Sequence, residues 1–164
     1  MTKIYLSLGS NLGDREANIA RAVDELRHRG VRVTRQSSIY ETEPVEIREQ
    51  AWFLNGVVEA ETEKSPLELL RVLLEIERAM GRVRNVKYGP RLIDMDILFF
   101  GSATIDSQEL VVPHPRLAER KFVLAPLAEI APDVQHPVLR KTAAELLATT
   151  LDHSEVRLWL PIKK

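Results

Sequence analysis

Arg91-Leu-Ile-Asp94-Met-Asp96-Ile-Leu-Phe-Phe100 is the stretch around which the rest of the chain can be organised. Its content of Ile, Leu and Phe is typical of a buried strand. Residues i and i+2 of a strand share a face, so Asp94 and Asp96 should point the same way, beside Leu92 and Leu98. The opposite face is expected to carry Ile93, Met95, Ile97 and Phe99. Two ionised carboxylates in such a strand are unfavourable unless a cation or strong donors compensate them.

A magnesium site would supply that compensation. Mg2+ prefers oxygen ligands and often bridges between carboxylates and substrate phosphates. The alternative is that Asp94 and Asp96 only form the solvent face of an antiparallel strand. Asp is depleted in strands, and the pair has apolar neighbours on its own face. The pattern therefore favours a metal site.

Positive charge lies directly upstream of the two aspartates. The basic residues are Arg78, Arg82, Arg84, Lys87 and Arg91. Taken alone, the 82–91 segment is an ordinary solvated loop, but guanidinium groups also suit phosphate binding. Beside the aspartates, the segment predicts a loop that presents arginines to a polyphosphate and closes over substrate.

Working outward, the hydrophobic pattern predicts the order β-α-β-β-α-β. The expected elements are a strand at 4–8, a helix at 14–30, a strand from 31 to about 40, a strand at 52–60, a helix at 65–81 and the strand that holds the aspartates. Asp14 is an expected N-cap, and Ser65 should form a capping box with Glu68. This order is the split βαβ pattern of ferredoxin-like folds, an α+β class. C-terminal additions should follow: an extended piece at 103–105, a helix at 123–130, a helix capped at Thr142 and a strand at 156–160.

Length and composition predict a single domain over residues 1–164. The net charge of −1 disfavours a dedicated nucleic-acid binder. The chain has no cysteine, which excludes disulfides and thiolate chemistry. The N-terminus has no signal-peptide character, and no apolar run approaches the ~18–20 residues of a membrane span. We expect a cytoplasmic protein with neither a membrane nor a nucleic-acid partner.

Several dispersed motifs then point to one family. They are Leu8-Gly-Ser-Asn-Leu-Gly13, Tyr40-Glu-Thr-Glu-Pro44, Phe53-Leu-Asn55, Gly81-Arg-Val-Arg84, the run from Lys87 to Leu98, Val112-Pro-His114 and the run from Arg120 to Pro132. Together they resemble the 6-hydroxymethyl-7,8-dihydropterin pyrophosphokinases of folate biosynthesis. The resemblance covers nearly the whole chain. It implies a three-layer α-β-α arrangement and the transfer of pyrophosphate from ATP to the pterin hydroxymethyl group, which gives AMP.

The resemblance also implies roles for individual residues. Asp94 and Asp96 would be ligands of two Mg2+ ions, and with Arg82 and Arg91 they would form the catalytic set. The residues implied for ATP binding are Glu77, Arg84, His114 and Arg120. The residues implied for pterin binding are Thr42, Val45, Phe53, Asn55 and Phe122. The enzyme is expected to be a monomer.

Side-chain chemistry supports the pterin assignment independently. A flat heteroaromatic ring is well held between two aromatic faces, here Phe53 and Phe122. Its donor and acceptor edge needs a side-chain amide, and Asn55 shares a strand face with Phe53. The alternatives are that both rings are plain core and that Asn55 only satisfies a turn.

Two other functions fit a ferredoxin-like order. A metal-dependent nucleotidyltransferase would use paired aspartates to attack the α-phosphorus and would release pyrophosphate. An RNA-binding module would need paired strand aromatics and a Lys/Arg-Gly-Phe signature, and the sequence has neither. In the favoured mechanism the pterin hydroxyl attacks the β-phosphorus in line, and positioning and charge neutralisation dominate catalysis.

Overall fold

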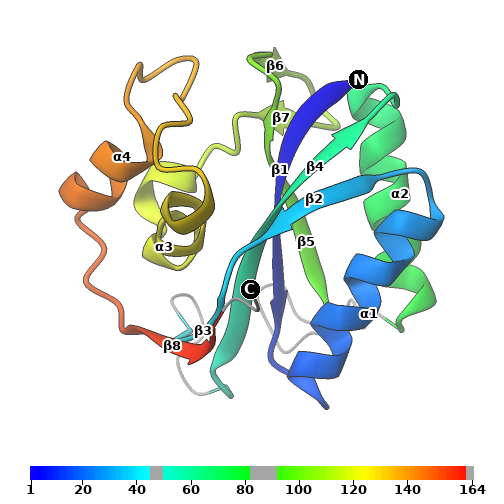
Figure 1. The fold of residues 1–164 in the computed structure, drawn as a ribbon, viewed down its shortest axis with the longest axis horizontal. Helices are drawn as coiled ribbons and strands as arrows, with labels where there is room; N and C mark the ends of the chain where they lie inside the picture. Colours follow the sequence, from blue (N-terminus) through cyan, green and yellow to red (C-terminus); the bar gives the residue numbers. More distant parts are fainter. Residues whose placement is uncertain (45–49, 82–91, 162–164) are drawn as a thin grey trace.

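The computed structural model describes residues 1–44, 50–81 and 92–161 (Figure 1). The elements in chain order are β1 (Thr2–Ser10), α1 (Arg15–His28), β2 (Arg32–Gln36), β3 (Ile39–Thr42), β4 (Phe53–Thr62), α2 (Pro66–Ala79), β5 (Asp94–Phe100), β6 (Ile105–Asp106), β7 (Val111–Val112), the 3-10 turn η1 (Leu117–Glu119), α3 (Lys121–Ile130), α4 (Ala143–Thr149) and β8 (Val156–Leu160). Within these ranges no helix is long and apolar enough to cross a bilayer.

The central sheet has the predicted ferredoxin-like order. Its strands run β5-β1-β4-β3-β8, with β2 also paired to β4 and every pairing antiparallel. Helices α1 and α2 cover one face and α3 and α4 the other, so the three-layer α-β-α arrangement is confirmed (Figure 1). Of the C-terminal additions, the strand β8 joins the sheet and pairs along the outer edge of β3.

Local signals place the helix starts where the sequence predicts them. The Asp14 side chain accepts a hydrogen bond from the Ala17 backbone and caps α1. Ser65 and Thr142 each form a complete capping box with the glutamate three residues on, at the starts of α2 and α4. The expected caps are confirmed, and they fix the points at which the chain turns back over the sheet.

The single strand expected from 31 to 40 is wrong, because the structure divides it into β2 and β3. Ser37 stands at the break: its hydroxyl accepts from the Val57 N–H at 2.8 Å and donates to the Ser38 carbonyl at 2.7 Å. Ser38 bonds the Glu129 carboxylate of α3 through both its N–H and its hydroxyl. Serine hydroxyls that compete with the backbone interrupt the ladder here, so β2 and β3 pair with separate halves of β4.

The expected face of Phe99 is also wrong. Tyr5 pairs with Phe99 and Leu6 with Ile97, so Leu98 is an extra residue in a β-bulge. The bulge shifts the alternation of β5: Met95 and Ile97 face the α1/α2 layer, whereas Leu98 and Phe99 both enter the core under α3 and α4. The carbonyl of the bulged Leu98 accepts the His114 N–H at 3.1 Å.

Candidate active site

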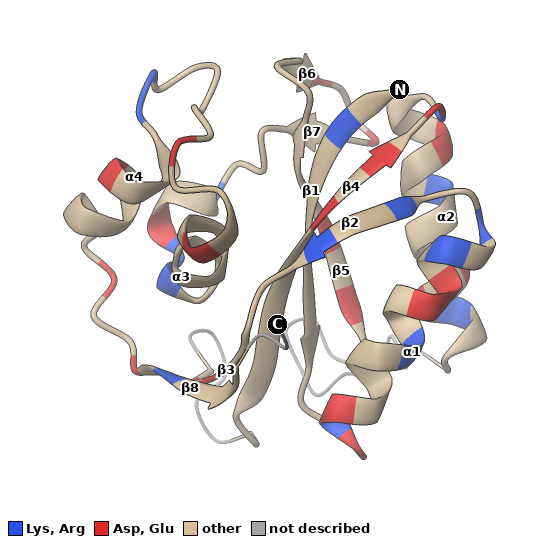
Figure 2. Ribbon diagram, in the orientation of Figure 1, with Lys and Arg blue, Asp and Glu red and all other residues tan. Residues whose placement is uncertain are grey.

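Asp94 and Asp96 lie on β5 as predicted, on one face and both partly exposed. Figure 2 shows acidic colouring on β5, and the rest of that strand is uncharged. The face is the one that α3 covers farther along the strand, and Met95 between them points into the opposite core. The edge strand β5 thus presents two partly exposed carboxylates side by side.

The sheet register brings a second polar group into line with this pair. Gly9 of β1 pairs with Asn55 of β4 on one side and with Asp94 of β5 on the other. Directly paired residues of antiparallel strands point to the same face. Asn55 and Asp94 therefore face the same space, two strands apart, with only a glycine between them.

Gly9 is a site residue that the sequence reasoning did not single out. A Cβ atom there would lie 2.5 Å from Asn55 Oδ1 and 3.5 Å from Phe53 Cδ1, so no larger side chain fits without displacing Asn55. The available signal was a glycine inside a strand pattern, which often marks a close approach. The missing side chain lets the Asn55 amide lie directly over the β1 backbone, between β4 and the strand that carries the carboxylates.

Three of the predicted pterin residues, Thr42, Phe53 and Asn55, lie together next to Gly9. Asn55 is buried and donates from Nδ2 to the Thr42 hydroxyl at 2.6 Å, which fixes the orientation of the amide. Phe53 pairs with Thr42 across the strands and is partly exposed. Phe122, near the start of α3, packs against the core on the same side of the sheet, with the Arg120 guanidinium 5.5 Å from its ring centre.

His114 lies beside the carboxylates, with Nε2 3.9 Å from Asp96 Oδ1. Burial and the positive charges of Arg120 and Arg116 lower its pKa to about 4, although Asp94 acts in the opposite direction. The ring is therefore neutral at pH 7. Because Nδ1 accepts the Arg116 N–H at 3.2 Å, the ring hydrogen is assigned to Nε2, which faces Asp96 as a donor.

Glu77, one of the residues predicted to bind ATP, is buried between α2 and β5. It is 2% exposed on α2, and its carboxylate accepts the Met95 N–H at 3.0 Å. It thus approaches β5 from the layer opposite to the face that carries Asp94 and Asp96. Its expected contact with ATP stays a prediction, as does that of Arg120.

Four predicted residues, Val45, Arg82, Arg84 and Arg91, fall outside the residues that the structure describes. Their expected roles in binding pterin and phosphate, and the expected closure of the 82–91 loop, stay predictions.

The two carboxylates fit a divalent cation of the magnesium kind. Within the described ranges, no three or more His, Asp or Glu side chains are grouped so as to hold a metal ion. A pair of carboxylates without a full protein cage is the donor set that Mg2+ commonly uses, because waters and substrate phosphates complete its shell. Asp94 and Asp96 are therefore the residues that would hold it.

The structure thus combines an α+β fold with a carboxylate pair on β5 and a buried amide on β4, on the same face of the sheet. The model of the 7,8-dihydro-6-hydroxymethylpterin-pyrophosphokinase (HPPK) family matches residues 5–132. The chain belongs to this family.

Two curated relatives support the same family assignment. The chain is 49% identical over 156 residues to the 2-amino-4-hydroxy-6-hydroxymethyldihydropteridine pyrophosphokinase of Bacillus subtilis, covering 94% of this chain and 89% of that protein. It is 50% identical over 135 residues to the protein of the same name in Methylorubrum extorquens, covering 82% and 85%.

Solved structures match the fold at lower identity. The wild-type HPPK-DHPS of Plasmodium falciparum has a TM-score of 0.72 and 19% identity, covering 90% of this chain. A further HPPK-DHPS structure, solved with substrates, has a TM-score of 0.75 and 17% identity. The chain spans 44% and 43% of those longer chains.

Proposed function

We propose that this chain transfers pyrophosphate from ATP to the hydroxymethyl group of 6-hydroxymethyl-7,8-dihydropterin, giving AMP and the pterin diphosphate, at the face shared by Asn55, Gly9 and Asp94. Family membership supports the reaction. The observation that carries the site assignment is the row of paired residues Asn55, Gly9 and Asp94 across β4, β1 and β5. It places an amide that can hydrogen-bond the edge of a heteroaromatic ring on one side of Gly9 and the carboxylate pair on the other.

The pterin ring is proposed to lie over Gly9, between Phe53 and Phe122. Asn55 then offers both a carbonyl oxygen and an amide N–H to the donor and acceptor edge of the ring, and Thr42 holds that amide in orientation. Stacking supplies apolar contact to the faces of the ring. Because Asp94 follows in the same row, the hydroxymethyl arm of a ring held by Asn55 is directed toward the carboxylates.

Asp94 and Asp96 are proposed to hold two Mg2+ ions. When bound, Mg2+ neutralises phosphate charge and lowers the pKa of a coordinated hydroxyl. The chain's own residues supply the positioning: His114 offers a neutral Nε2–H donor next to Asp96, suited to a phosphate oxygen. Arg82 and Arg91 stay predicted phosphate contacts, and Arg84, Arg120 and Glu77 predicted ATP contacts.

The test is to incubate the protein with ATP, Mg2+ and the hydroxymethyl pterin and to identify both products. AMP together with a pterin diphosphate is the expected result. Release of free pyrophosphate with a nucleotidylated acceptor would instead establish the rival nucleotidyltransferase and overturn the proposal. Omission of pterin is the control, since AMP formation should then cease.

We also propose that the enzyme acts as a monomer in the cytoplasm, where its co-substrate ATP is made available. Light scattering of the purified protein tests the oligomeric state, and a mass of twice the 18.7 kDa chain would contradict it. Cell fractionation with an antibody against the chain tests the location.

A further inference from the structure

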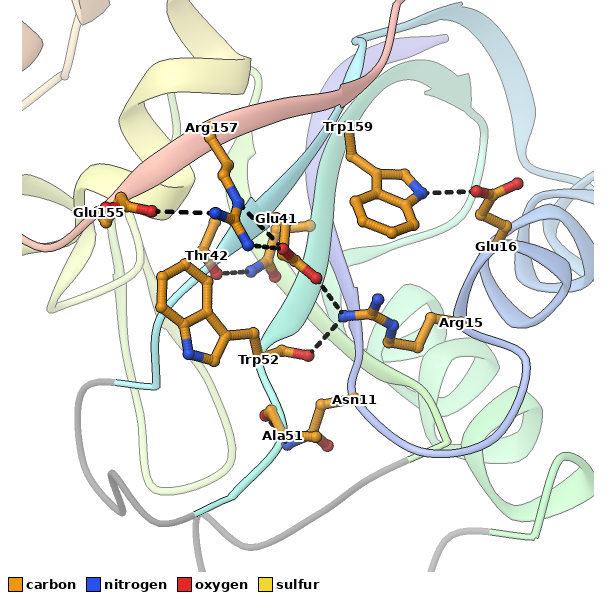
Figure 3. Close-up of polar contacts among 11 residues, drawn as sticks. Asn11, Arg15, Glu16, Glu41, Thr42, Ala51, Trp52, Glu155, Arg157 and Trp159 are labelled. Atoms are coloured by element: carbon orange, nitrogen blue, oxygen red, sulfur yellow. Dashed lines mark hydrogen bonds and ion pairs between the residues drawn. The ribbon is translucent and has the colours of Figure 1, made fainter.

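Glu41 of β3 is the buried centre of an ionic network on the α1 side of the sheet, whose Arg157 and Trp159 side chains reach the surface (Figure 3). It is 7% exposed. Arg15, the first residue of α1, donates to Glu41 Oε2 at 3.0 Å, and Arg157 of β8 donates through Nε to Oε1 at 3.0 Å. Three elements far apart in the chain therefore meet at one carboxylate.

The same two arginines hold Trp52, the residue that precedes β4. Arg15 donates to the Trp52 carbonyl at 2.8 Å, and the Arg157 guanidinium lies 4.8 Å from the centre of its ring. Trp159 of β8 completes the set, with the Arg15 guanidinium 5.1 Å from its ring and its Nε1 bonded to Glu16. We call Arg15, Glu41, Trp52, Arg157 and Trp159 the Glu41 network.

The Glu41 network lies directly behind the proposed pterin pocket. Thr42 and Phe53 are the chain neighbours of Glu41 and Trp52, and successive residues of a strand point to opposite faces. One face thus carries the network, and the other carries Thr42, which orients the Asn55 amide. A shift of the β3 and β4 ends would move Thr42 and Phe53 together.

Pairing with the C-terminal strand also holds the end of β3 that lies next to the proposed pterin pocket. β8 pairs with β3 along its length, with Glu41 opposite Arg157 and Thr42 opposite Val156. Beyond the strand ends, the Glu43 N–H donates to the Glu155 carbonyl at 3.2 Å, and the Glu155 N–H donates to the Glu43 carboxylate at 2.8 Å. Contacts of the last strand therefore continue one residue past Thr42.

We infer that the Glu41 network holds the pterin pocket in its binding shape, so that Arg15, Glu41 and Arg157 are positioning residues for pterin binding. The inference rests on the proposed function. A buried carboxylate held by two guanidinium groups gives a defined geometry that flexible loop ends lack. Its loss should weaken the recognition of pterin while leaving ATP binding and the chemical step nearly unchanged.

The test compares Arg157→Met and Glu41→Gln with the wild-type enzyme in steady-state kinetics. Met keeps an apolar stem over Trp52 but cannot bond Glu41, and Gln keeps the shape of Glu41 without its charge. We expect each to raise the KM for pterin by roughly tenfold, with kcat and the KM for ATP changed by less than about twofold. Arg157→Lys should restore only part of the loss, because Lys lacks the planar fork.

Arg21→Met is the matched control, because Arg21 is an exposed arginine on α1 whose side chain lies outside the network. It should leave every constant unchanged. Both tryptophans of the chain belong to the network, so their emission spectrum reports independently whether a variant has disturbed it.

Three outcomes would contradict either this inference or the proposed function. A changed emission spectrum with an unchanged KM for pterin overturns the inference, because the network would then be only structural. Equal losses toward ATP and pterin also overturn it. A wild-type protein that makes no pterin diphosphate overturns the proposed function instead, and with it the basis of the inference.

Discussion

Gly9 has no side chain at the one position in β1 where a substituent would fall between Asn55 and Asp94. Its importance is therefore steric rather than conformational, since its neighbours and not its backbone angles exclude a larger residue. A single methyl group is enough to test whether the gap is used.

We expect Gly9→Ala to raise the KM for pterin roughly 10- to 100-fold, because displacement of Asn55 by about 1 Å disturbs its alignment with the ring. Steady-state kinetics with varied pterin measures the effect. Gly56→Ala is the control: a Cβ there meets Ser37 Oγ at 3.4 Å and Ser38 O at 3.7 Å, which are ordinary contacts. Full activity of Gly9→Ala would show that the ring binds elsewhere.

Asp96→Asn should lower kcat by about 100-fold or more, because a neutral amide is a weak ligand for Mg2+ and leaves phosphate charge unscreened. Removing one of two neighbouring like charges should leave the melting temperature unchanged or slightly raised. Activity assays across Mg2+ concentrations, together with thermal melts, measure both effects. Asp133→Asn, at an exposed position, serves as the control. An active Asp96→Asn enzyme with unaltered Mg2+ dependence would refute the assignment.

The elements themselves were largely predictable, because they depend on local signals. The caps Asp14, Ser65 and Thr142 each lie three residues before the backbone N–H that they bond, so sequence spacing reveals them. The break at Ser37 and Ser38 was not predictable, because it depends on Glu129, 91 residues further along the chain. The bulge at Leu98 likewise exists only through pairing with β1.

The candidate site divides in the same way. Asp94, Asp96 and Asn55 have side chains suited to binding a metal ion or a ring edge, so the sequence alone was enough to predict them as candidates, and the structure places them on one face. The proposed roles of Gly9 and Arg157 depend on their neighbours across the sheet, which the sequence alone does not reveal.

The loop between α3 and α4 gives the fold a pH dependence through His136. Its ring is 8% exposed, and Nδ1 accepts the N–H groups of Val138 and Leu139 at 3.1 and 3.0 Å. Burial lowers the pKa of His136. The unfolded chain takes up the proton below about pH 6.5, whereas the folded chain resists it to lower pH, so stability is lost as pH falls below about 6.5.

We expect His136→Asn to remove this dependence, because Asn keeps an acceptor for the two N–H groups but does not titrate. Urea unfolding at pH 5 and pH 7 measures it, with a wild-type loss from His136 of at most about 1.4 kcal/mol per pH unit. His114, whose pKa is also lowered, contributes equally to both proteins, so their difference isolates His136. Parallel pH profiles of the two proteins would contradict the expectation.

Across the molecule, the sheet separates two apolar cores. One lies under α1 and α2 and contains Leu26, and the other lies under α3 and α4 and contains Phe99. Tyr5 and His136 pack edge-on against the Phe99 ring, with centroids 6.2 and 5.9 Å away. Because β1, β4 and β5 contribute side chains to both cores, neither layer can loosen without disturbing strands that the other needs.

We therefore expect residues 1–164 to unfold as one cooperative unit. Leu26→Ala should lower the unfolding free energy by about 2–5 kcal/mol and Phe99→Ala by about 3–5 kcal/mol, through the cavities they leave. Each variant should shift a single urea transition, as followed by far-UV circular dichroism and tryptophan fluorescence. Two separate transitions in either variant would refute a single domain.

The place of Gly9 in β1 would also make the proposed site depend on correct strand alignment. A slip of β1 by one residue would bring Leu8 or Ser10 opposite Asn55 and would turn Ile4, Leu6 and Leu8 out of their core. A misaligned strand would thus place a side chain in the proposed pterin site and expose apolar surface in the same event. Chaperones and proteases that recognise exposed apolar surface would therefore remove the inactive molecules, although they do not sense activity.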